Sequence, residues 1–262
     1  MRKLTEKDFV LIKEEVLKGR LTIQGMRRFL LGTFAFSVFL VGLAFAVANA
    51  NTVGWDTLSN GWHALFYVQG ILLSLHLLII LLCWSYSAFN QKVLSVSVVV
   101  ITYKVAFDPY LTILMFSKDR GIFDSFAPWI LMIIVGALIL HVFFLVKWMR
   151  DLKAGVFNNS KSKKLAKSRF IILMPILFLL VAFTGGIFKS GILGDSELLI
   201  ILFIFVILTI CLLYAVCELI IACYCIFRFP SFSVNAPKRK NVQHANNKKN
   251  KKKKKNRNRK RR

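Results

Sequence analysis

Long apolar runs separated by short polar segments dominate this chain. Four runs, 29–49, 64–84, 128–147 and 170–188, each supply about the 20 apolar residues that a helix needs to cross a hydrocarbon core about 30 Å thick. A fifth run, 198–227, is longer than one crossing requires, which indicates a helix that tilts or extends past the cytoplasmic interface. The pattern therefore predicts membrane-spanning helices rather than a soluble core.

The distribution of basic residues decides whether the stretch 93–116 is a further span. This stretch is long enough to cross, but it contains Lys104, Asp108 and Pro109, so hydropathy alone does not assign it. Eight Lys and Arg residues lie in the first 28 positions, eight lie in 147–169, and fifteen follow position 237. The positive-inside rule places all three segments in the cytoplasm. Six crossings allow this arrangement and five do not.

We therefore predict an all-α, polytopic transmembrane bundle with both termini in the cytoplasm. Residues 1–28 form a basic cytoplasmic segment with an amphipathic helix over 5–24, opened by a capping pattern at Thr5. This helix either lies in the headgroup layer or packs under the bundle. Residues 228–262 form a polybasic tail that is too polar to fold alone and is expected to be disordered. The membrane bundle, 29–227, comprises the predicted spans 29–49, 64–84, 93–116, 128–147, 170–188 and 198–227.

Composition supports a membrane protein and excludes other classes. The chain of 262 residues is 56% hydrophobic and carries 37 Lys and Arg against 12 Asp and Glu. Apolar and charged residues occupy different stretches, which excludes a soluble domain with one core and a wholly disordered chain. None of the five cysteines lies in a predicted outer loop, so no disulfide framework is expected. Richness in Phe, Lys and Asn is typical of a bacterial plasma membrane protein, and the cell membrane is the predicted location.

Two charged residues inside the third predicted span are candidates for function. Lys104 lies about 11 residues into the span, near mid-depth, and Asp108 follows one helical turn later on the same face. Charges at this depth are costly unless they are paired. The neighbouring Pro109 removes a backbone donor and favours a kink. Such a pair serves either as a proton or ion relay or as a structural pin between helices.

Two histidines near the middles of their spans are further intramembrane polar candidates. His76 and His141 could titrate near neutral pH or bind a metal. Neither has a second His, Asp or Glu three or four residues later, so a metal site is not expected. A hydrogen bond to a neighbouring helix is the favoured interpretation. The sequence also lacks the motifs of nucleotide sites and common hydrolases, so no catalytic residue and no cofactor is predicted.

Small residues recur along the first predicted span. Gly42, Ala46 and Ala50 are spaced by four positions and form a stripe that permits close approach of another helix. The pattern predicts a helix-packing face without identifying its partner.

The tail contains a run of basic residues with three possible roles. The run comprises Lys251, Lys252, Lys253, Lys254 and Lys255. Anionic headgroups of the inner leaflet would attract it with about 1 kcal/mol per basic residue. Ribosomal or other RNA is a second possible partner, and the tail could also set topology alone.

These features favour a non-enzymatic accessory or protective protein, similar in role to an immunity protein. It would act through helix contacts with another membrane protein or with a second copy of itself. The alternative is a small-solute or ion permease that uses the Lys104–Asp108 pair and His76 within the bundle.

Overall fold

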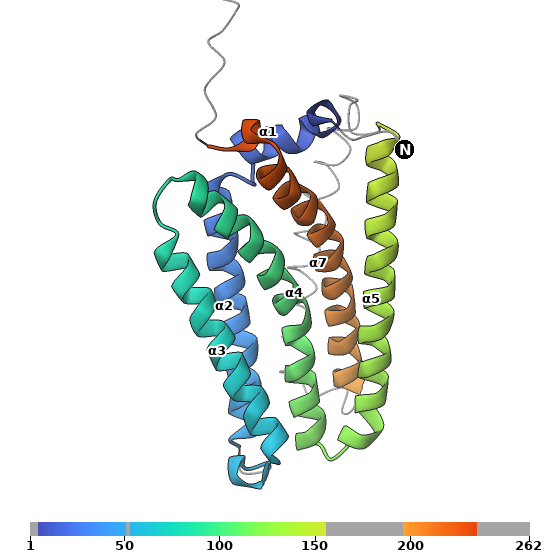
Figure 1. Ribbon diagram of the computed structural model, residues 1–262. Helices are drawn as coiled ribbons and strands as arrows, with labels where there is room; N and C mark the ends of the chain where they lie inside the picture. The colour runs from blue at the N-terminus through green and yellow to red at the C-terminus, as the bar shows by residue number, and fades with distance from the viewer. Residues whose placement is uncertain (1–4, 51–52, 156–195, 235–262) are drawn as a thin grey trace, which may run out of the picture.

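The structure, a computed structural model, describes residues 5–50, 53–155 and 196–234 (Figure 1). This part of the chain is helical apart from short connections and contains no strand. Five of its helices are long and apolar enough to cross a membrane: α2 (Ile23–Ala48), α3 (Asn60–Leu82), α4 (Ala88–Asp119), α5 (Phe123–Lys153) and α7 (Ser196–Arg228). The protein is therefore an all-helical, membrane-embedded chain.

α4, α5 and α7 contain their predicted spans and extend beyond them. α2 and α3 begin before the predicted spans 29–49 and 64–84 and end one and two residues before the last positions of those spans. The uncertain stretch 93–116 lies within α4, which stays continuous through Pro109. The run 198–227 fills almost all of α7, whose 33 residues make it the longest of the five. The remaining predicted span, 170–188, lies outside the described residues.

The helices form a bundle with α4 at its centre. Figure 1 shows α4 between α2 and α7, with α3 and α5 at opposite edges, and the most extensive contacts of α4 are with α2 and α7. α1 (Val10–Lys18) lies across one end of the bundle, here called the α1 end. The first residues of α2 and α4 and the last residues of α3, α5 and α7 share this end. The opposite end is called the far end.

The N-terminal helix packs on the bundle through one apolar face. Phe9, Ile12 and Val16 are buried in a cluster with Leu152 of α5 and Ile221 of α7. Of the two positions predicted for this helix, packing against the bundle is the one observed. α1 contacts the last turns of α5 and α7, so it lies outside the central apolar segments of these two helices.

The bounds of this N-terminal helix differ from the prediction. The Thr5 backbone N–H donates to Asp8 Oδ2 at 2.8 Å and opens the short helix η1 (Glu6–Phe9), which confirms the predicted cap. The helix then ends at Lys18 and not at residue 24, because Gly19 leaves the helical conformation. The Thr22 hydroxyl accepts from the Gly25 N–H at 3.2 Å and starts α2. Ile23, predicted to belong to the first helix, is therefore the first residue of α2.

At the far end, small residues of α2 let the neighbouring connection close over the bundle. Ala44 and Ala48 are fully buried against Leu111 and Met115 of α4. The connection to α3, which includes the short helix η2 (Trp55–Thr57), joins the same cluster.

A buried amide fixes the segment from which the predicted tail departs. Gln91, in the first turn of α4, donates from Nε2 to the Phe232 carbonyl and accepts at Oε1 from the Val234 N–H, both at 2.9 Å. The short helix η4 (Pro230–Phe232) thereby lies beside α1. The described residues at the two ends of the chain, Thr5 and Val234, are both located at the α1 end.

Candidate functional site

The predicted intramembrane ion pair is present and almost completely buried. Lys104 Nζ lies 2.8 Å from Asp108 Oδ1 and 2.7 Å from Asp108 Oδ2. The two side chains are 10% and 1% exposed, respectively. Because these residues are one turn apart on α4, their charges neutralise each other on a single helix.

A serine from α2 completes this group. Lys104 Nζ also donates to Ser37 Oγ at 2.6 Å, and the Ser37 hydroxyl donates to Asp108 Oδ2. The three N–H groups of the ammonium thus have three nearby acceptor oxygens. We call Ser37, Lys104 and Asp108 the polar triad. Its hydrogen bonds join the central helix to α2.

Two further hydrogen bonds hold α4 where Pro109 interrupts its backbone donors. The Thr112 hydroxyl donates to the Leu40 carbonyl of α2 at 3.0 Å. The Thr209 hydroxyl of α7 donates to the Ala106 carbonyl at 2.9 Å. Proline has no N–H and weakens the preceding turn, so acceptors there are available to neighbouring helices. The bend of α4 visible in Figure 1 occurs in a helix pinned on both sides.

His141 joins three helices through neutral hydrogen bonds. Its Nδ1 lies 2.9 Å from the Leu213 carbonyl of α7, and its Nε2 lies 2.6 Å from the Tyr103 hydroxyl of α4. A carbonyl only accepts, so Nδ1 carries the proton and Nε2 accepts from Tyr103. Cys217 Sγ is 3.8 Å from Nδ1 and adds a weak contact. The histidine makes the bond to neighbouring helices that the sequence favours.

His76 is located at a different contact, between α3 and α2. Its Nε2 donates to the Leu30 carbonyl at 2.9 Å, and its ring meets the Phe34 ring edge-on with centroids 5.3 Å apart. The other ring nitrogen, Nδ1, is buried and has no partner among the described residues. The structure therefore brings Lys104 and Asp108 together but places His76 and His141 in separate hydrogen-bonded contacts.

No metal centre is formed by the described residues, in which no three His, Cys, Asp or Glu side chains are grouped suitably for an ion. The cysteines are all free thiols, and Cys217 and Cys225 are fully buried among apolar side chains. Burial of this kind is typical of a cysteine that serves as a small apolar side chain.

The predicted small-residue stripe has an unexpected position on α2. Gly42 and Ala46 are exposed, Ala50 is half-buried, and a Cβ added at Gly42 would meet no described atom within 4 Å. The face of α2 that packs against α4 instead carries Ser37, Ala44 and Ala48, spaced by seven and then four positions. Gly42 and Ala46 thus make no close helix contact within the described bundle. Their role as a face for a partner stays a prediction.

Sequence reasoning missed two positions that the structure makes central. Ser37 is a lone hydroxyl in an apolar run, and only its distance from Lys104 reveals its role. Glu218 of α7 forms an ion pair with Arg20, which lies in the connection between α1 and α2. The predicted tail residues Lys251, Lys252, Lys253, Lys254 and Lys255 lie outside the described residues.

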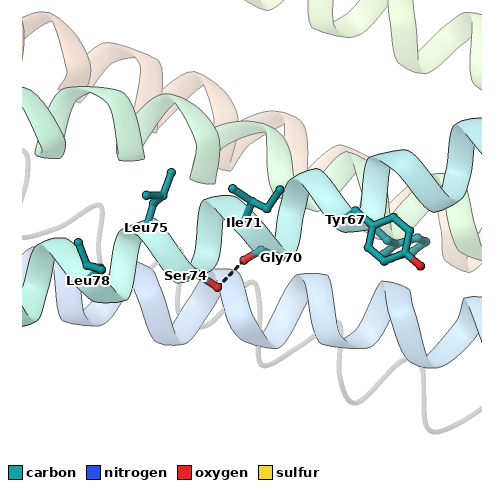
Figure 2. A pocket seen from close by; sticks show the side chains of 7 residues that line it. Tyr67, Gly70, Ile71, Ser74, Leu75 and Leu78 are labelled. Carbon is teal, nitrogen blue, oxygen red and sulfur yellow. Dashed lines mark hydrogen bonds between the residues drawn. The ribbon is translucent and has the colours of Figure 1, made fainter.

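A shallow hollow of about 480 Å³ lies on the outer face of α3 and not beside the polar triad. Figure 2 shows its lining side chains along successive turns of this one helix, with the Ser74 hydroxyl bonded to the Gly70 carbonyl at 2.9 Å. Tyr67, Ile71 and Leu78 border it. A hollow that is open along one helix is suited to an acyl chain of a lipid or to a side chain of another helix rather than to an enclosed solute.

Comparison with known proteins adds no family assignment. The chain matches no protein-family model, and neither curated proteins nor solved structures show detectable similarity to it.

Proposed function

We propose that this chain is a non-enzymatic accessory protein of the cell membrane that acts through contact with another membrane protein. Protection of the cell against a membrane-active protein, as immunity proteins provide, is one form of this role. The observation that supports the proposal is the complete pairing of the two charged side chains inside the bundle. Lys104 and Asp108 are fully paired with each other and with Ser37.

A relay for protons or ions needs groups that exchange partners with a moving solute. In the polar triad every ammonium N–H points at an acceptor within the triad, and Asp108 is 1% exposed. The hydrogen bonds from Thr112 and Thr209 hold the same helix against α2 and α7. This arrangement supports a structural pin over a transport site.

The outer faces of the edge helices are where contact with a partner is available. The exposed side chains of α3 include Tyr67, Ile71 and Leu75, and those of α5 include Leu131 and Ile139. In a bilayer such faces contact lipid or another helix, and small residues allow the closer approach. Gly42 and Ala46 add a small-residue surface on α2.

We further propose six crossings with the α1 end in the cytoplasm. The last residue of α5 and the first residue of α7 lie at opposite ends of the bundle, which supports one more crossing between them. At the far end the described charges are Asp56, Lys118, Asp119, Arg120, Asp124 and Glu197, with more acids than bases. The described basic residues at the α1 end are Lys7, Lys13, Lys18, Arg20, Arg27, Arg28, Lys92, Lys147, Arg150, Lys153 and Arg228. This asymmetry follows the positive-inside rule.

The polybasic tail would add contacts with the membrane surface. Its root at Val234 is held at the α1 end by Gln91, so the tail would begin on the same side as the basic residues of the bundle. Anionic inner-leaflet lipid is the proposed partner, and RNA or the ribosome remains the competing one.

The decisive experiment is recovery of the full-length protein from native membranes in mild detergent, with quantification of the proteins that accompany it. We expect a stoichiometric membrane partner. Gly42→Leu should release this partner while leaving the bundle folded, since a Cβ added there meets no described atom within 4 Å. Ala44→Leu is the matched control for a folding defect, because Ala44 is fully buried.

The same recovery experiment, combined with a transport measurement on Asp108→Asn, separates the accessory role from the permease. A permease would be recovered alone or as a homo-oligomer and would lose transport in Asp108→Asn while still inserting. Recovery without any partner, together with such a loss, would reject the accessory role.

A further inference from the structure

The connection between α3 and α4, residues 83–87, is held by a side chain of α2. Arg27 donates from Nε to the Cys83 carbonyl at 2.8 Å and from Nη2 to the Ser85 carbonyl at 2.9 Å. Nη2 also donates to the Trp84 carbonyl. One guanidinium therefore satisfies three consecutive carbonyls at the end of α3, where an α-helix leaves acceptors unpaired.

The other side of the connection is fixed by the start of α4. Asn90 Nδ2 donates to the carbonyl and hydroxyl oxygens of Ser85 at 3.0 and 2.7 Å. The Ser87 hydroxyl accepts from the Asn90 N–H at 3.0 Å and caps the helix. The connection is thus held by Arg27 of α2 on one side and by Asn90 of α4 on the other.

The braced connection and the first turn of α4 carry three exposed aromatic rings. Trp84, Tyr86 and Phe89 are 70%, 61% and 73% exposed. The Arg27 guanidinium lies 5.6 Å from the centroid of the Trp84 ring and 5.0 Å from that of Tyr86. Tryptophan and tyrosine pair an apolar ring with a polar hydrogen, and such rings are enriched at the boundary between headgroups and acyl chains.

The Arg27 guanidinium has no acidic partner among the described residues. All three hydrogen bonds of Arg27 go to neutral carbonyls, and its Nη1 makes none in the described part of the chain. Arg20 and Arg120, in contrast, form ion pairs with Glu218 and Glu197. An arginine that is rigidly held, partly exposed and not neutralised attracts an anion with several oxygens, such as a phosphate.

We propose that Arg27, Trp84 and Tyr86 form a binding site for the phosphate of an anionic phospholipid in the leaflet at the α1 end. The Nη1 N–H groups of Arg27 face the phosphate charge, and the indole N–H and phenol O–H are additional donors. The exposed rings extend into the adjacent acyl region. This site rests on the membrane embedding of the chain and is independent of any protein partner.

Native mass spectrometry of the full-length protein tests this site by titration with phosphatidylglycerol, with phosphatidylcholine and with inorganic phosphate. We expect phosphatidylglycerol to bind most tightly and Arg27→Gln to weaken it about tenfold, the loss of a charge-assisted pair. Arg28→Gln is the matched control: it removes one charge from the adjacent exposed position and should change binding by less than about twofold. The tail is present in every variant, so its contribution cancels.

Arg27→Gln also removes hydrogen bonds that hold the connection, so a second variant is needed that leaves these bonds in place. Trp84→Ala keeps the carbonyl that Arg27 binds but removes the exposed ring, and it should weaken phosphatidylglycerol binding several-fold with unchanged thermal stability. Equal binding by the wild type, Arg27→Gln and Trp84→Ala would overturn the site. Equal affinity for phosphatidylcholine, or full displacement of the lipid by inorganic phosphate, would also overturn the assignment to anionic phospholipid.

Discussion

Asp108 of α4 and Ser37 of α2 share a hydrogen bond in the buried interior, and Lys104 donates to both of them. A bridge of this kind ties the charge pair of one helix to its neighbour. Loss of either charge leaves the other charge buried without its partner, which costs more than loss of both.

We therefore predict unequal effects of single and double substitutions at this pair. Asp108→Ala should lower the free energy of unfolding by about 3–5 kcal/mol, because the Lys104 ammonium remains buried. The double variant Lys104→Met/Asp108→Leu should be close to wild type, since both charges are replaced by apolar groups of similar size. Unfolding of the purified protein in mixed micelles with increasing SDS measures both values. If the double variant were as unstable as Asp108→Ala, the pin would not be primarily electrostatic.

The contact of Tyr103 with His141 offers a smaller, pairwise test. Tyr103→Phe removes the hydroxyl that donates to His141 Nε2 and should destabilise the bundle by about 0.6 kcal/mol and by no more than about 1.7 kcal/mol, the average and the maximum for hydrogen bonds between membrane helices. In a double-mutant cycle with His141→Phe, the coupling energy should have the same magnitude. A coupling near zero would show that the two side chains do not stabilise each other.

The spanning helices could be recognised from sequence because their signal is local. Each long apolar run within the described residues falls largely in one helix, and charge parity identified 93–116 despite Lys104 and Asp108. The pairing of these residues was also predictable, since it depends only on the spacing of one turn. Contacts between helices were not, because they depend on rotation and depth relative to neighbours.

Ser37 and the stripe at Gly42 show this limit. Both lie on α2, but small size alone does not tell which side of a helix faces the bundle. The buried side follows Ser37, Ala44 and Ala48, so the spacing of four at Gly42, Ala46 and Ala50 selected an outer face. Arg27 was likewise counted only as a charge, since its acceptors lie more than 50 positions away.

The root of the tail should loosen when Gln91 loses its amide. Gln91→Leu keeps a buried side chain of similar size but breaks the hydrogen bonds to Phe232 and Val234. We expect faster amide hydrogen exchange at Val234 and faster tryptic cleavage after Arg228, both measurable by mass spectrometry. Gln24→Leu, the same replacement at an exposed position of α2, should change neither. Unchanged exchange in Gln91→Leu would show that apolar packing of Phe232 is sufficient to hold the segment.

Labelling of single cysteines from the two sides of the membrane tests the proposed topology. In a cysteine-free variant in sealed, right-side-out membranes, Asp56→Cys should react with a membrane-impermeant maleimide, since Asp56 is exposed at the far end. Lys18→Cys, exposed at the α1 end, should react only after the membrane is permeabilised. Six crossings predict the same protected behaviour for Lys163→Cys and for Lys251→Cys. Without the crossing between α5 and α7, Lys163 would stay protected and Lys251 would lie outside; without a crossing by 93–116, both would lie outside. Labelling of Lys251→Cys in sealed membranes would therefore reject six crossings, and labelling of Lys163→Cys would reject the crossing by 93–116, while Asp56→Cys and Lys18→Cys serve as references for the two sides.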